Sequence, residues 1–113
     1  MPSSLNQQHC TPCRGGVEPL DKAAAEAYLA NLPSWRLAEH GKCINRDFRF
    51  KTFAQALAFV KEVGAIAEGE GHHPDIAFGW GYASISLQTH KINGLHENDF
   101  ILAAKIDALV RPE

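Results

Sequence analysis

A long helical pattern that stops abruptly before a proline constrains the fold of this chain more than any other feature. Residues 52–71 carry apolar side chains at helical period, in a stripe of Phe53, Leu57, Val60 and Ala67 with Ala56 and Val63 beside it. Thr52, followed three positions later by Gln55, has the spacing of a capping box. Pro74 disfavours helical geometry at His73, so the helix must end before a histidine pair and the chain must continue in an extended segment.

Strand patterns lie on both sides of this helix. After it, residues 76–78 are followed by the turn Gly79-Trp80-Gly81 and by residues 82–90, where apolar and polar side chains alternate. The alternation predicts a strand that places Ala83, Ile85 and Leu87 on the core. Before the helix, residues 35–37 and 44–50 alternate in the same way and predict two antiparallel strands joined through residues 40–42. Arg46 falls on the same side of its predicted strand as Phe48 and Phe50, which are expected to be buried. The alternation does not explain a charged side chain on that side.

Two further helices are predicted, one near each end of the chain. The first begins after Asp21, a good N-cap residue, and ends before Pro33. The last spans about residues 97–110 and is apolar on most of its circumference, which in so small a domain predicts burial against another subunit. The order helix, strand, strand, helix, strand, strand, helix predicts an α+β fold. We expect a four-stranded antiparallel sheet with about three helices packed on one face.

The first 18 residues differ in composition from the rest. They are rich in Ser, Gln, Pro and Gly without any period, which predicts a flexible N-terminal arm (1–18) before a single domain (19–113). Cys10 and Cys13 in this arm have C-x-x-C spacing, but a second ligand pair at zinc-ribbon spacing is missing. A plain polar arm is therefore the simplest interpretation, with a zinc or redox site involving His9 as the alternative.

Charge and hydropathy exclude several classes of partner. The formal net charge of -2 offers no electrostatic footprint for nucleic acid or an anionic membrane. No apolar run approaches the roughly 20 residues that span a bilayer. The first ten residues lack the basic start and apolar stretch of a secretory signal, so we expect a cytoplasmic protein.

Three of the six histidines fall within 19 residues, at His72, His73 and His90. The predicted hairpin returns the chain, so these imidazoles can meet. Such a cluster suits acid–base catalysis at neutral pH or the binding of a transition metal. Adjacent histidines in an extended chain seldom reach one ion, which weakens the metal interpretation. Spacing alone leaves a third alternative open, in which the histidines are surface residues without a catalytic or metal-binding role.

A longer motif around the cluster resembles the pterin-4a-carbinolamine dehydratase family. It consists of EGEGHHP at residues 68–74, an aromatic residue at position 80, TH at residues 89–90 and G-L-x-x-x-D at residues 94–99. The surroundings are also similar, including R-x-F-x-F at residues 46–50 and DFILAAKID at residues 99–107. The resemblance covers roughly residues 20–110 and leaves the N-terminal C-x-x-C outside.

The resemblance implies a lyase of pterin recycling. Its reaction is the dehydration of 4a-hydroxytetrahydrobiopterin, the pterin-4a-carbinolamine, to quinonoid dihydrobiopterin and water. It implies a functional link to phenylalanine hydroxylase, which produces the carbinolamine, and assembly as a homodimer or homotetramer. No cofactor is expected, because the pterin is the substrate and losing water requires only an acid and a base. The alternative is a dimerisation or transcriptional cofactor protein of the same fold, which would not need the histidines.

The resemblance also implies roles for individual residues. It makes His72, His73 and His90 the catalytic side chains, and we expect His72 and His90 to be the acid–base pair while His73 orients the pterin. The residues expected to contact the substrate are Glu68, Pro74, Trp80, Thr89 and Asp99.

Some of these residues have an ordinary structural alternative. Asp99 could equally be a first-turn carboxylate favoured by the helix dipole, and Trp35 and Trp80 could serve packing alone. We expect Thr89 to support His90 from the strand. His96 stands where the family commonly has Ser or Thr, and histidine is a poor N-cap, so the capping of the last helix is in doubt.

Overall fold

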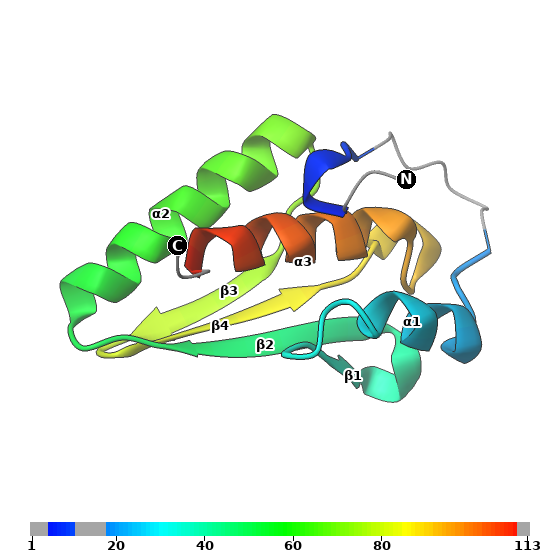
Figure 1. Cartoon of the computed structure of the whole chain (residues 1–113), viewed down its shortest axis with the longest axis horizontal. Coiled ribbons are helices and arrows are strands. Elements are labelled where there is room, and N and C mark those ends of the chain that lie inside the picture. Colours follow the sequence, from blue (N-terminus) through cyan, green and yellow to red (C-terminus); the bar gives the residue numbers. More distant parts are fainter. Residues whose placement is uncertain (1–4, 11–17, 111–113) are drawn as a thin grey trace.

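The computed structural model describes residues 5–10 and 18–110 and contains the predicted α+β fold (Figure 1). Its antiparallel sheet has the strand order β1-β2-β4-β3. The strands are β1 (Arg36–Ala38), β2 (Cys43–Arg49), β3 (Asp75–Gly79) and β4 (Tyr82–Leu87). The helices are α1 (Lys22–Leu29), α2 (Phe53–Glu70) and α3 (Glu97–Val110), and α2 and α3 lie over the same face of the sheet (Figure 1). Within the described residues, no helix is long and apolar enough to cross a membrane.

The ends of α2 are determined by local sequence. The Thr52 side chain accepts a hydrogen bond from the Gln55 N–H (3.1 Å), and Gly71 ends the helix in the left-handed conformation (φ 67°). The buried face is rotated from the predicted stripe and consists of Ala56, Phe59, Val63 and Ala67. Phe53 is 43% exposed because it occupies the first turn, beyond the core, where its ring stacks on Phe78. Phe53, the first residue of the predicted apolar stripe, is therefore not part of the buried face.

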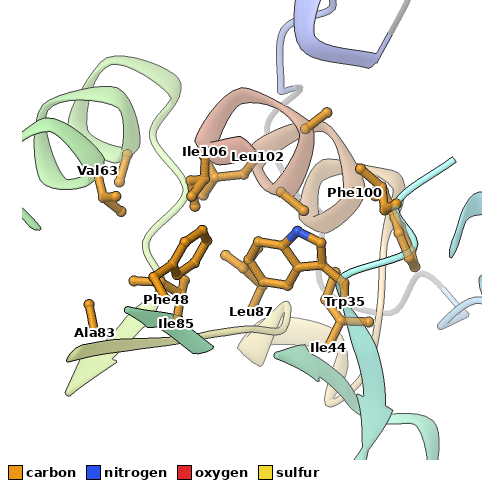
Figure 2. Close-up of a cluster of buried hydrophobic side chains, with 14 of the residues drawn as sticks. Trp35, Ile44, Phe48, Val63, Ala83, Ile85, Leu87, Phe100, Leu102 and Ile106 are labelled. Atoms are coloured by element: carbon orange, nitrogen blue, oxygen red, sulfur yellow. The ribbon is translucent and has the colours of Figure 1, made fainter. Parts of the chain in front are cut away.

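The core lies between the sheet and the helices. The predicted inward residues Ala83, Ile85 and Leu87 are fully buried, and Figure 2 shows their side chains beneath those of α2 and α3. Trp35 is also buried in this core.

Arg46 lies on the helix-facing side of β2, as its parity indicated. Its guanidinium lies 4.3 Å from the centre of the Phe48 ring and 2.5 Å from Asp107 Oδ1 on α3. The Trp35 indole N–H donates to the same carboxylate oxygen at 2.8 Å. An ion pair and a cation–π contact therefore satisfy the charge that strand alternation alone left unexplained.

Strand β4 is shorter than predicted. It ends at Leu87, and the chain then turns through a 3-10 segment, His90–Ile92, with Asn93 in the left-handed region (φ 55°). Thr89 N donates to Gly94 O at 2.8 Å and closes this turn. His90 is consequently on a turn and not on the strand, because the backbone pairs with itself here instead of with β2.

Helix α3 is covered within the chain. Its buried residues face the sheet on one side, and η1 (Leu5–Gln7) packs against the helix on another (Figure 1). Residues 5–10 of the predicted arm thus lie on the domain, whereas Cys13 falls outside the described residues. The apolar circumference of α3 is accounted for by one chain and is not evidence for a subunit contact.

Candidate active site

The structure brings the three predicted histidines into one cleft. His72 and His73 follow the C-cap of α2, and His90 lies in the turn after β4, so the β3–β4 hairpin returns it to the histidine pair. The cleft has a volume of about 370 Å³. Its lining consists of Gly71, His72, His73, Gln88, Thr89, His90 and Lys91.

His72 is held from behind by a buried carboxylate. Its Nε2 lies 2.5 Å from Asp99 Oδ1, and the side chains of His72 and Asp99 are 11% and 0% exposed. The other carboxylate oxygen accepts hydrogen bonds from the Thr89 hydroxyl (2.9 Å) and the His96 backbone N–H (3.0 Å). A carboxylate only accepts, so the hydrogen of a neutral His72 ring lies on Nε2 and its Nδ1 carries a free lone pair.

His96 caps α3 by an arrangement that the sequence analysis did not foresee. Its Nδ1 accepts from the Asn98 N–H at 3.0 Å, while Asp99, three residues on, bonds back to the His96 N–H. This reciprocal pattern is that of a capping box, with an imidazole in place of a hydroxyl. The His-x-x-Asp spacing was the available signal. Asp99 is therefore a first-turn carboxylate, as one alternative had it, and also the partner of His72; its side chain is fully buried and does not line the cleft.

The other two histidines are exposed. His73 Nε2 lies 2.7 Å from Glu68 Oε1, with side chains 59% and 79% exposed. His90 Nδ1 lies 3.2 Å from the Gln88 amide nitrogen, and its Nε2 is 3.9 Å from Asp75 Oδ2. Because an amide nitrogen only donates, a neutral His90 ring carries its hydrogen on Nε2. Gln88 was not among the predicted site residues, although strand alternation places it on the same face as His90, two positions further on.

Three other residues that were predicted to contact the substrate lie in different parts of the structure. Pro74 is half-buried and directs the chain from His73 into β3. Thr89 is buried and bonds Asp99, so it supports His72 and not His90 as expected. Trp80 is 71% exposed in the β3–β4 turn, at the opposite end of β3 from the histidines. The structure does not bring Trp80 to the cleft of its own chain.

A second polar group lies behind the end of α2. The Glu70 carboxylate accepts from the Cys10 backbone N–H (2.7 Å), and His9 Nδ1 and Lys105 Nζ lie 3.0 and 3.7 Å away. Burial alone would raise the pKa of Glu70, but these hydrogen bonds and the Lys105 charge hold it below its usual range. Burial, together with the Glu70 charge, raises the pKa of Cys10 to about 12, which disfavours a thiolate. Among the residues described by the structure, no three His, Cys, Asp or Glu side chains group to hold a metal ion.

Comparison with known proteins identifies the family. The model of the family "Pterin 4 alpha carbinolamine dehydratase" matches residues 18–109. The chain belongs to this family. A pterin-4-alpha-carbinolamine dehydratase homologue from Aromatoleum aromaticum is 55% identical over 109 residues, which is 96% of this chain and 97% of the relative. A second homologue, from Methylococcus capsulatus, is 54% identical over 94% of this chain and 93% of the relative.

Two solved structures share the fold. The crystal structure of a transcriptional coactivator/pterin dehydratase from Brucella melitensis has a TM-score of 0.78 at 29% identity and covers 83% of this chain and 100% of its own. A pterin dehydratase-like protein, identified as a RuBisCO assembly factor in the alpha-carboxysome, has a TM-score of 0.61 at 32% identity. That match covers 71% of this chain and 93% of the other.

Proposed function

We propose that this protein is a hydro-lyase that dehydrates 4a-hydroxytetrahydrobiopterin to quinonoid dihydrobiopterin. Membership of the dehydratase family supports the reaction. The observation that carries the proposal is the Asp99–His72 pair, in which a fully buried carboxylate orients an imidazole that lines a cleft shared with two other histidines. The same use of a buried aspartate to orient a histidine and select its tautomer occurs in hydrolytic triads.

The two tautomers suit the two halves of a dehydration. His72, with a free Nδ1 lone pair, takes the proton from the pterin ring nitrogen next to the carbinol carbon. His90, with its hydrogen on Nε2, protonates the departing hydroxyl. The C–O bond breaks, a C=N bond forms between the carbon and that nitrogen, and water leaves with no change of oxidation state. His73, Glu68 and Pro74 at the rim are proposed to orient the pterin.

The proposed reaction implies which enzyme supplies the substrate. The substrate is the product of an aromatic amino acid hydroxylase, so we propose a functional link to phenylalanine hydroxylase in the cytoplasm. We also propose that the protein is a homodimer or homotetramer. A second candidate function is that of a transcriptional cofactor, which the description of the Brucella melitensis relative favours. A protein that acted only in that way would not accelerate the dehydration.

The decisive test is a direct rate measurement. A hydroxylase generates the carbinolamine, and its decay is followed by absorbance with and without the purified protein. We expect the protein to accelerate decay, and the double variant His72→Ala/His90→Ala to lose at least about 100-fold of that acceleration. His40→Asn is the matched control, since this histidine does not line the cleft and asparagine accepts its positive φ. A wild-type protein that leaves the decay rate unchanged would refute the proposed function.

A further inference from the structure

Residues 5–10 contact both helices that support the candidate active site. They precede residues 18–109, which the family model matches. Their 3-10 turn, η1, packs against α3, and Leu5 packs against the hydrophobic core (Figure 1). The last two residues of the segment reach the end of α2 through the side chain of Glu70. The segment is therefore placed to influence how the end of α2 meets α3.

The Glu70 carboxylate is the point where this segment, α2 and α3 meet. Its Oε1 accepts a hydrogen bond from the Cys10 backbone N–H at 2.7 Å, and its Oε2 lies 3.0 Å from His9 Nδ1. Lys105 Nζ on α3 lies 3.7 Å from the same Oε2. The side chains of Glu70 and Lys105 are 11% and 14% exposed. Because a carboxylate so enclosed is costly to leave unpaired, these partners hold the Glu70 side chain in one position.

The same segment also contacts the first turn of α3. The Cys10 thiol donates to the Asn98 backbone carbonyl oxygen at 3.6 Å, and Asn98 is buried and precedes Asp99 in the sequence. On α2, Glu70 is the last residue of the helix and stands two positions before His72. Cys10 therefore contacts one residue next to Asp99 and another two positions from His72, the two members of the buried pair.

The two members of the His72–Asp99 pair are held unequally. The Asp99 carboxylate has two further hydrogen-bond donors besides the His72 ring. His72 instead follows a helix end with a glycine on each side of Glu70, and the second of these, Gly71, is left-handed (φ 67°). Glycine leaves the backbone conformationally permissive, so the position of His72 depends on side-chain contacts near this helix end. In the last turn of α2, Glu70 makes such contacts with α3, whereas the Glu68 side chain is 79% exposed.

We infer that Glu70 is a positioning residue for the dehydration, whose carboxylate binds Cys10 and Lys105 and thereby keeps His72 against Asp99. The inference rests on the proposed function for its effect on the rate. Glu70 does not line the histidine cleft, so it acts through His72 and not on the pterin. Without the carboxylate, the end of α2 gains freedom, and the His72 ring spends less time within reach of Asp99. The chemical step then slows, while binding of the pterin changes little.

The first test separates kcat from KM in the full-length protein. Glu70→Ala should lower kcat about tenfold and change KM by less than about twofold. Glu70→Gln can still accept from the Cys10 N–H but loses the charge opposite Lys105, so its kcat should fall only about threefold. Glu62→Ala removes an exposed glutamate from the same helix, and this matched control should keep the wild-type kcat. A kcat of Glu70→Ala within about twofold of wild type, or a loss confined to KM, would overturn the inference.

The second test observes the His72–Asp99 hydrogen bond without any activity. A buried imidazole N–H bonded to a carboxylate exchanges slowly with water and gives a downfield proton NMR signal, which is assigned by its loss in His72→Ala. Glu70→Ala should speed this exchange at least about tenfold and Glu70→Gln less, while Glu62→Ala should leave it unchanged. The two Glu70 variants are measured side by side, so that the milder one carries the test if the alanine variant does not fold.

The NMR signal also separates positioning from stability. A role for Glu70 in stability alone would lower the midpoint of thermal unfolding and leave the His72 signal unchanged, and that outcome would overturn the inference. A wild-type protein that does not accelerate the dehydration would instead refute the proposed function. The NMR comparison would then decide by itself whether Glu70 positions His72.

Discussion

His72 and His73 are neighbours in the chain, and each lies within hydrogen-bonding distance of a carboxylate, yet their environments are opposite. The distances are 2.5 Å for His72 to Asp99 and 2.7 Å for His73 to Glu68. The first pair is 11% and 0% exposed, and the second is 59% and 79% exposed. Distance therefore says little about what each pair contributes, whereas burial and the number of additional partners say much.

The two histidine–carboxylate pairs differ in burial because their carboxylates lie on different helices. Asp99 lies in the first turn of α3, where the Thr89 hydroxyl and the His96 N–H also bond it and hold it in one position. Glu68 lies in the last turn of α2, and its carboxylate is largely in water. A buried carboxylate with three donors can orient a histidine for chemistry, while an exposed one can at most bias it.

The largest expected effect follows from Asp99→Asn. The amide nitrogen can donate to the His72 ring and so favour the tautomer that lacks a free Nδ1, while the uncharged amide oxygen accepts more weakly from Thr89 and His96 than the carboxylate does. We expect the dehydration rate to fall about 100-fold or more and the free energy of unfolding to fall by about 1–3 kcal/mol. Stopped-flow rates and thermal unfolding measure the two effects. A rate within twofold of wild type would mean that His72 does not need its buried partner.

A smaller effect is expected for Thr89→Val, which removes one donor from Asp99 while keeping the shape of the side chain. The rate should fall about tenfold and the stability by about 1 kcal/mol, because Asp99 keeps its other two donors. Thr89→Ser is the matched control, since it retains the hydroxyl and should stay near wild type in rate. Equal losses in the valine and serine variants would show that the methyl group, and not the hydrogen bond, is what matters.

The smallest effect is expected for Glu68→Gln. This pair is exposed, so removing the charge should change stability by less than about 0.5 kcal/mol and the rate by no more than about threefold. The same rate assay and thermal unfolding, run beside Asp99→Asn, make the comparison direct. If Glu68→Gln were as damaging as Asp99→Asn, the contrast between the buried and the exposed pair would be wrong.

Much of the fold followed from periodicity because each element carries its own local signal. Asp21, Thr52 and Gly71 act at helix ends as their residue types indicated, and Ala83, Ile85 and Leu87 are buried as their alternation predicted. Predictions were wrong where a contact distant in sequence decides whether a side chain is buried or where a strand ends. Phe53 belongs to the predicted apolar stripe but is exposed in the first turn of α2, and β4 was extended through a turn that a Thr89–Gly94 bridge closes.

By itself, the sequence determined the order and type of the elements, the histidine cluster and, through a long motif, the family. These properties are carried by neighbouring residues or by spacing. Only the tertiary structure decided that Asp99 bonds His72 and that Thr89 supports Asp99 and not His90. It likewise showed Arg46 paired with Asp107 and Trp80 far from the cleft of its own chain. The reason is that the roles of these side chains depend on partners up to 61 positions away, which only the packing of α3 and the hairpin brings together.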